Sequence, residues 1–196
     1  MKIKKIFIIF FMYYFSLNNT YSLEPDIFVQ STVNRASQIL SKNISKEDKI
    51  SELKAIAKET VDIKGVGFYS LGSARKKLND NDKKLYSELF ESYFLKSFSS
   101  RLAEYTNPEI EVKSKEILNK NYTIVNSILI GTSERPEVKI DWRIYTKNPN
   151  DPLIRDLIIE GLSLARTQKE EFSSILNSND GDINALFKTL KKFSEN

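Results

Sequence analysis

The spacing of apolar residues changes once along the chain, at Pro108, and this change restricts the fold more than any other feature of the sequence. Upstream, apolar side chains recur at helical spacing. This pattern predicts helices at 24–41 and 45–60, a short one within 61–78, and a long one at 83–105. Downstream the spacing becomes two residues, which is typical of strands. It predicts strands at 109–118, 122–130, 137–145 and 153–160, before helices return at 162–176 and 183–193.

Helices followed by strands and again by helices indicate an α+β domain. We expect the helices to pack on a four- to five-stranded, mostly antiparallel sheet. Alternation along the third strand places Ile140, Trp142 and Ile144 on one face. The strands at 122–130 and 153–160 are apolar on both faces, at least in part. The longest predicted helix has an apolar set broader than one stripe, which indicates contact with more than one layer.

The first 22 residues have the order of regions that export machinery recognises in a signal peptide. Three lysines precede an apolar run of 12 residues. This run is shorter than the roughly 20 residues that a membrane-spanning helix needs. Small polar residues follow, and we expect cleavage after Ser22, so that 1–22 is a cleaved signal peptide and 23–196 a single domain. The alternative is an uncleaved N-terminal anchor.

The composition excludes several kinds of function for the mature chain. Cleavage removes three lysines and leaves 27 Lys and Arg residues against 26 Asp and Glu residues, so the chain offers little basic surface to nucleic acid. Cysteine and histidine are both absent, which excludes disulfides, thiol nucleophiles, histidine metal sites and the usual catalytic triads. A carboxylate pair or a Ser-Lys arrangement stays open, so an enzyme is possible although nothing in the sequence supports it.

A glycine-rich stretch, GVGFYSLGSARKK at 65–77, invites comparison with phosphate-binding loops. A dinucleotide fingerprint requires glycine at its sixth position, where the chain has Ser70. A Walker loop requires lysine after its last glycine, and Gly72 is followed by Ser73. Both nucleotide interpretations are therefore weak. We expect the glycines to serve tight turns and close helix packing instead.

Further along, several segments occur in an informative order. They are the helical region 61–105 with its Leu-Gly and long aromatic helix, VKIDWRIY at 138–145, DLIIEGLSLARTQKEEFSSIL at 156–176, and GDINALFKTLKK at 181–192. Together they resemble the MlaC family of periplasmic phospholipid-binding proteins over essentially the whole mature chain. The chain departs from the family pattern at Ile140, where valine is common, and at the turn 179–181, which replaces Gly-Gly.

The resemblance implies a periplasmic lipid carrier that is not an enzyme, holds no metal or other cofactor, and has bound phospholipid as its cargo. Such a carrier shuttles phospholipid between an outer-membrane lipoprotein–porin complex and the MCE-domain ring of an inner-membrane ABC transporter complex, and so maintains lipid asymmetry. Nucleic acid is not an expected partner. Two alternatives stay open: an exported interaction or adaptor module with a closed core, and a carrier of another lipid such as a hopanoid.

From the residues alone, the aromatic helix and the apolar sheet are either an ordinary core or the lining of a cavity. The resemblance favours an elongated apolar lipid cavity between the sheet and the helices, because the long helix has enough apolar surface to cover the sheet and to leave a lined gap. Arg143 alternates to the other face of its strand, which makes it a candidate structural or partner-docking residue. The predicted lining residues are Phe68, Leu71, Phe90, Phe94, Ile140, Trp142, Ile144, Ile159 and Leu162.

These features predict a soluble periplasmic protein whose mature chain begins near Leu23. Cell fractionation followed by N-terminal sequencing is expected to find the protein in the periplasmic fraction without residues 1–22, because the short apolar run serves export and not anchoring. Retention in the membrane pellet after a carbonate wash would contradict the prediction and favour the uncleaved anchor.

Overall fold

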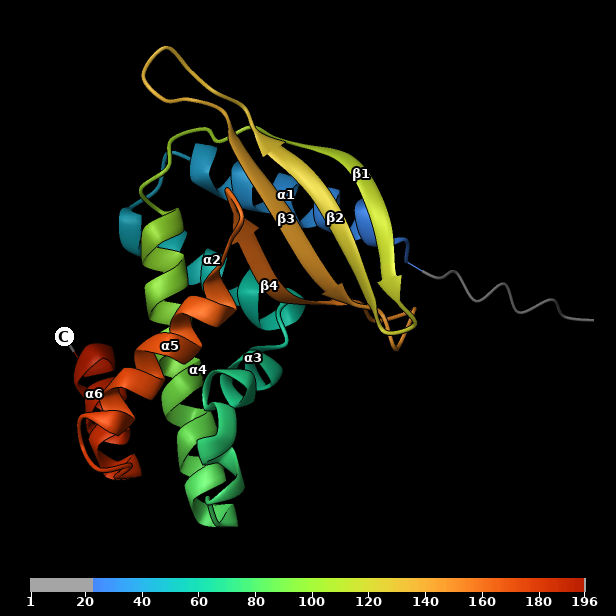
Figure 1. Ribbon diagram of the computed structural model, residues 1–196. Helices are drawn as coiled ribbons and strands as arrows, with labels where there is room; N and C mark the ends of the chain where they lie inside the picture. The colour runs from blue at the N-terminus through green and yellow to red at the C-terminus, as the bar shows by residue number, and fades with distance from the viewer. Residues whose placement is uncertain (1–22, 196) are drawn as a thin grey trace, which may run out of the picture.

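The computed structural model describes residues 23–195, so the expected signal peptide at 1–22 lies outside the described residues. Helices come first along the chain, then the strands, then further helices, and this order confirms the α+β prediction (Figure 1). The elements are α1 (Pro25–Ser41), α2 (Lys46–Thr60), α3 (Ile63–Ser70), the 3-10 helix η1 (Gly72–Lys76), α4 (Asp80–Leu102), β1 (Ile110–Asn119), β2 (Tyr122–Leu129), β3 (Val138–Tyr145), β4 (Leu153–Ile159), β5 (Leu162–Ser163), α5 (Leu164–Asn177) and α6 (Ile183–Glu195).

The strands form one sheet in which each strand pairs with its neighbour in sequence, in the order β1-β2-β3-β4-β5. Every pairing between these strands is antiparallel, as predicted. An isolated parallel bridge joins Val61, at the end of α2, to Ile154 of β4. The short strand β5 was not predicted, because two residues cannot show an alternation and the sequence pattern merges them with the helix that follows.

One face of the sheet is buried under helices and the other is open. On β3 the side chains of Ile140, Trp142 and Ile144 are all buried, which agrees with the predicted alternation. The helix α1 lies behind β1 and β2 and packs against both, while α3 and α5 pack against β4 (Figure 1). The helical layer therefore packs against the buried face of the sheet.

The strand β2 shows that apolar composition alone does not decide which face is covered. Its buried side chains are Thr123, Val125 and Ser127. The larger apolar residues Ile124 and Ile128 lie on the opposite face and are only half-buried. Apolar residues on both sides of this strand thus do not mark two covered faces.

Side-chain caps set the start of several helices, among them α2 and α4. The Ser45 hydroxyl accepts a hydrogen bond from the backbone N–H of Asp48 at 3.0 Å, one residue before α2. In the same way, the side-chain oxygen of Asn79 accepts from the N–H of Asp82 at 2.9 Å. Such caps satisfy N–H groups that have no partner within the helix. Because of this cap, α4 begins at Asp80 and not at the predicted residue 83.

The long helix α4 contacts most of the other helices, since it packs against α2, α3 and α6 (Figure 1). Its side chains Tyr86 and Phe90 are each only 1% exposed. Its broad apolar set thus meets several neighbouring helices. Within residues 23–195, no helix has both the length and the apolar character needed to cross a membrane.

Close packing of α3 on α4 explains one glycine of the stretch at 65–77. A Cβ atom on Gly67 would lie 2.7 Å from Cδ1 of Phe90, and the Tyr86 hydroxyl donates a hydrogen bond to the Gly67 carbonyl oxygen at 2.8 Å. Gly72 has a φ of 56° at the turn from α3 into η1, a conformation that disfavours side chains. The expected roles in packing and turns are confirmed for these two glycines.

The substitution Gly67→Ala is expected to destabilise the protein by about 1–3 kcal/mol, because the added methyl group overpacks the contact with Phe90. At an unhindered helical position the same change would stabilise by about 0.4–1 kcal/mol. Chemical denaturation of Gly67→Ala, Phe90→Leu and the double variant measures the coupling. The double variant should lose less stability than the sum of the single changes, and strict additivity would contradict a direct contact.

Candidate functional site

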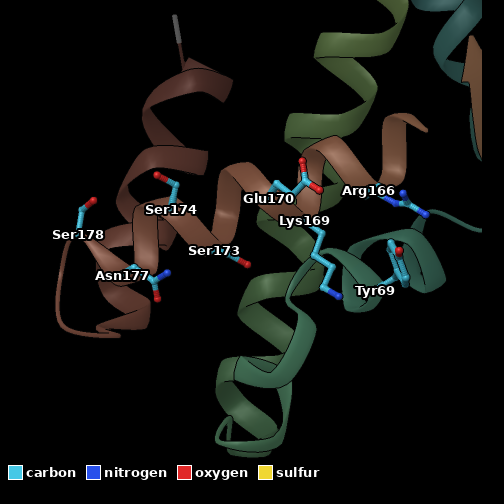
Figure 2. Close-up of a pocket in the computed structure, with 8 residues that line it drawn as sticks. All are labelled: Tyr69, Arg166, Lys169, Glu170, Ser173, Ser174, Asn177 and Ser178. Carbon is cyan, nitrogen blue, oxygen red and sulfur yellow. The ribbon is translucent and has the colours of Figure 1, made fainter. Parts of the chain in front are cut away.

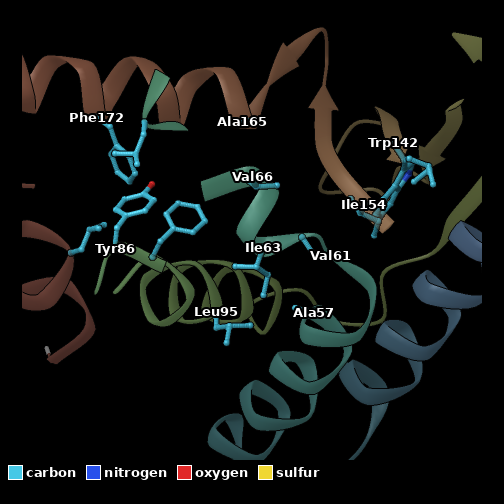
Figure 3. Packing of buried hydrophobic residues seen from close by; sticks show 14 of the residues in the cluster. Ala57, Val61, Ile63, Val66, Tyr86, Leu95, Trp142, Ile154, Ala165 and Phe172 are labelled. Carbon is cyan, nitrogen blue, oxygen red and sulfur yellow. The ribbon is translucent and has the colours of Figure 1, made fainter. Parts of the chain in front are cut away.

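A cavity of about 220 Å³ lies between α4, α5 and the sheet. Its lining comes from segments that are far apart in the sequence, and Figure 3 shows buried side chains around it, including Trp142, Ile154 and Ala165. The lining residues are Val61, Val66, Phe90, Tyr93, Phe94, Ser97, Phe98, Arg101, Trp142, Ile154, Arg155, Asp156, Leu157, Leu164, Ala165, Thr167, Gln168 and Glu171.

The cavity is mostly apolar in its depth and mostly charged at its rim. The lining residues that are buried are mostly apolar and include Val66, Phe90, Trp142 and Ile154. Those that are exposed to solvent are Arg101, Leu164 and Glu171. A ligand that fits this gradient has an apolar part to bury and a polar part that stays in contact with water.

Aromatic side chains of α4 form one wall of the cavity. Phe90, Phe94 and Phe98 are spaced four residues apart, so they lie on one stripe of the helix. The ring centroids of Phe90 and Phe94 are 6.1 Å apart and those of Phe94 and Phe98 are 5.5 Å apart. From α5, the ring of Phe172 meets Phe90 edge-on at 6.1 Å. These contacts hold the wall in place through aromatic packing.

The sheet contributes Trp142, whose polar edge is satisfied away from the cavity. The indole Nε1–H donates a hydrogen bond to the Ser127 hydroxyl at 2.8 Å, and that hydroxyl donates to the backbone oxygen of Ile140 at 3.0 Å. A buried indole N–H without a partner would be costly. Because Ser127 provides the partner, the indole leaves no unpaired donor beside the apolar interior.

A buried carboxylate, Asp156, attaches the start of α5 to the sheet. Its side chain is 2% exposed and lies 3.7 Å from an Nη atom of Arg143 on the adjacent strand. One oxygen of Asp156 accepts from the Ser163 hydroxyl at 2.6 Å, and the other accepts from the Ala165 backbone N–H at 3.0 Å. The ion pair fits the structural role predicted for Arg143. Since α5 forms a wall of the cavity, Asp156 also positions that wall.

At the rim, a chain of hydrogen bonds connects α4 to α5. The Tyr93 hydroxyl donates to the side-chain oxygen of Gln168 at 2.8 Å, and the Gln168 side-chain nitrogen donates to Glu171 at 2.9 Å. Burial raises the pKa of the Tyr93 phenol, and the hydrogen bond to Gln168 partly offsets the rise. Glu171 raises this pKa further and Arg101 lowers it, so both charges act on the same hydroxyl.

A second, wider depression of about 800 Å³ lies on another side of α5, where that helix faces α3 (Figure 2). Lys169 of α5 and Tyr69 of α3 face each other across it, with the Lys169 Nζ atom 5.5 Å from the ring centroid. The remaining lining residues are polar or charged, namely Arg166, Glu170, Ser173, Ser174, Asn177 and Ser178. This depression therefore does not suit an apolar ligand.

The structure distributes the predicted lining residues over three environments. Phe90, Phe94 and Trp142 line the cavity. Leu71, Ile140 and Ile144 are buried in the core without lining it. The others are more exposed and also lie outside the lining: Phe68 and Ile159 are half-buried, and Leu162 of β5 is 60% exposed.

Several lining residues were not predicted. Phe98 continues the stripe of Phe90 and Phe94, so its spacing carried a usable signal. Tyr93 and Arg101 lie on the neighbouring row of the same helix. This row lines the cavity only because α5 packs opposite it, and the sequence does not reveal where α5 lies. Gln168 is polar and its sequence neighbourhood contains no sign of a lining role.

The site as a whole suits binding by burial of apolar surface. Each methylene group moved from water into an apolar interior gains about 0.8 kcal/mol. Across residues 23–195, no group of three or more His, Cys, Asp and Glu side chains is placed to hold a metal ion. The polar groups at the rim can supply hydrogen bonds and charges to the polar part of a ligand that stays outside the cavity.

Removal of the Asp156 carboxylate should loosen α5. Asp156→Ala is expected to lower the free energy of unfolding by about 2–4 kcal/mol, because Ser163 and the Ala165 N–H lose a charged acceptor and Arg143 loses its partner. Asp156→Asn keeps an acceptor and should lose less. Denaturant unfolding measures the loss, and amide hydrogen exchange should accelerate at the start of α5. Unchanged exchange there in Asp156→Ala would contradict the anchoring role.

Comparison with known proteins gives one family and one fold. The family model described as "MlaC protein" matches residues 30–192. A solved structure of a phospholipid-binding protein from Ralstonia solanacearum, in complex with a phospholipid, is similar to this chain with a TM-score of 0.74 and 17% sequence identity. The similarity covers 88% of this chain and 98% of that chain. No curated protein matches the sequence.

Proposed function

The chain belongs to the MlaC family, and from this premise we propose that it is a periplasmic carrier that binds the acyl chains of phospholipid in the cavity between α4, α5 and the sheet. It shuttles lipid between the outer-membrane lipoprotein–porin complex and the MCE-domain ring of the inner-membrane ABC transporter complex, and so maintains lipid asymmetry. It performs no catalysis, and the phospholipid is cargo and not a cofactor.

The observation that carries this proposal is the cavity itself, which is apolar in its depth and polar at its exposed rim. Two fatty chains joined to a polar head group have the same division of character. The similar protein from Ralstonia solanacearum was solved with a phospholipid, which supports a lipid as the ligand of this fold. The amphiphilic cavity is the feature of this chain that matches such a ligand.

The energetics explain why a carrier is needed. A diacyl lipid exposes roughly 30 methylene groups when it leaves a membrane, and at about 0.8 kcal/mol each this costs on the order of 20 kcal/mol. Unassisted passage through an aqueous compartment is therefore very slow. A protein that offers an apolar interior removes most of this barrier without making or breaking a covalent bond.

The cavity volume implies that its walls separate when lipid enters. A cavity of about 150 Å³ accommodates benzene, so the 220 Å³ present here is sufficient for only part of one acyl chain. The additional space has to come from outward movement of a wall. Under this proposal the predicted residues that now lie outside the lining become lining residues of the widened cavity; they are Phe68, Leu71, Ile140, Ile144, Ile159 and Leu162.

The small volume is also the observation that favours the second candidate, an exported adaptor module with a closed core. Organic extraction of the purified protein and mass spectrometry of the extract separate the two functions. A carrier should yield lipid in a fixed ratio to protein, and the extract also distinguishes phospholipid from another lipid such as a hopanoid. If the protein is lipid-free after purification and takes up no lipid from phospholipid vesicles, the carrier function is contradicted and the adaptor function is supported.

Phe94→Asp is expected to reduce bound lipid about tenfold or more, because an unpaired charge in an apolar cavity costs at least about 1–3 kcal/mol. Ile159→Asp should act in the same direction in the widened cavity. The measurement is bound lipid per folded protein, together with thermal unfolding of each variant. Ile117→Asp is the control, since Ile117 of β1 is 78% exposed and lies outside the cavity lining.

A lining residue and a core residue differ in which of these quantities changes. If Phe94→Asp loses thermal stability while its folded fraction still carries the normal amount of lipid, Phe94 belongs to the core and its assignment to the lipid site fails. Normal stability with little bound lipid supports the assignment.

A further inference from the structure

Two opposite charges lie at the rim of the cavity on different helices. Arg101 is near the end of α4 and Glu171 is in the middle of α5, and both line the cavity and are exposed. Many exposed charges of this chain are paired, as Lys58 is with Glu91 at 3.1 Å. Among residues 23–195, neither Arg101 nor Glu171 has an oppositely charged side chain within 4.0 Å. Both remain able to pair with charges of a ligand.

The position of Glu171 is fixed by the hydrogen-bond chain at the rim. One of its oxygens accepts from Gln168, which in turn accepts from the half-buried Tyr93 hydroxyl. Because Tyr93 is held by aromatic contacts with Phe90 and Phe172, the carboxylate is tied to the packed wall. A charge that is oriented in this way loses little side-chain entropy when it binds a ligand.

The position of Arg101 follows from the helix. It lies two helical turns beyond Tyr93 on the row that also contains Ser97, and all three residues line the cavity. A guanidinium group has a planar set of donors that matches phosphate oxygens. A carboxylate such as that of Glu171 pairs with an ammonium group in the same manner, through charge-assisted hydrogen bonds.

We propose that this rim is a head-group site for zwitterionic phospholipids, in which Arg101 binds the phosphate and Glu171 binds an amine. The inference rests on the proposed carrier function. With the acyl chains in the cavity, the head group lies at the mouth between α4 and α5, where its phosphate meets Arg101 and its amine meets Glu171. Glu171 attracts a head group that ends in an ammonium group and repels one with a net negative charge. The carrier therefore prefers amine-bearing phospholipids over anionic ones with identical chains.

The chain offers matched controls on the other side of α5. Glu170 is adjacent to Glu171, and Arg166 lies one turn earlier, but both line the polar depression that faces α3 (Figure 2). Substitutions of these two residues change the net charge of the protein by the same amount without touching the rim.

The experiment incubates the lipid-free purified protein with vesicles that contain phosphatidylethanolamine and phosphatidylglycerol in equal amounts with the same acyl chains. Bound lipids are extracted and quantified by mass spectrometry. The wild-type protein should be enriched in the ethanolamine lipid. Glu171→Gln should reduce this preference about two- to fivefold, the range of exposed charge pairs, and Glu171→Lys should reverse it. Arg101→Gln should reduce the uptake of both lipids about fivefold, while Glu170→Gln and Arg166→Gln should match the wild type.

The outcomes separate this inference from the carrier function. Equal uptake of the two lipids by the wild type, with no change of ratio in either Glu171 variant, overturns the head-group site and leaves the carrier function intact. Absence of both lipids from the wild type overturns the carrier function itself. A change in ratio that Glu170→Gln reproduces indicates an effect of net charge and also overturns the site. Thermal unfolding confirms that each variant is folded, and the conservative Glu171→Gln retains the size of the side chain.

Discussion

The attachment of α5 to the sheet depends on one buried carboxylate, Asp156. It accepts hydrogen bonds from Ser163 and from the Ala165 N–H, and it pairs with Arg143 across the strands. These contacts fix the direction in which the chain leaves β5, and so they help to position one of the helical walls of the cavity. A buried ion pair adds little stability compared with well-packed apolar residues, although removing one partner is costly. The specific contribution of Asp156 is therefore to define where α5 begins and which of its residues reach the cavity.

Most buried polar side chains of the core have hydrogen-bond partners within the protein; among residues 23–195 the buried Arg143 Nε atom is the exception. The Trp142 indole donates to Ser127, and the Tyr86 hydroxyl donates to the Gly67 carbonyl. The buried hydroxyl of Ser70 donates to the carbonyl oxygen of its own helix four residues earlier. Because these donors are already paired, the core can border an unfilled cavity and present no unpaired donor to it. Polar atoms without such partners would bring water into the same space.

The sequence predicts the element types well because periodicity is a local property. It does not predict which face of β2 is covered, since Ser127 is buried for its bond to Trp142 on another strand and Ile124 faces outward. The same limit applies to the cavity. The stripe that includes Phe94 is visible in one helix, whereas the lining role of Gln168 exists only because α5 lies opposite Tyr93. Residues that act through a partner on another element require the tertiary arrangement.

The order of the strands has a consequence for how the protein reaches its folded state. Every strand of the sheet pairs with its neighbour in sequence, and the connections between the strands are short, so little loop-closure entropy opposes their pairing. Sheets built from local pairs fold faster than those that join distant segments. Under the proposed function the chain crosses a membrane in extended form, and this strand order favours its folding on the far side. The sheet forms from strands that are neighbours in sequence, and the helices then have a surface on which to dock.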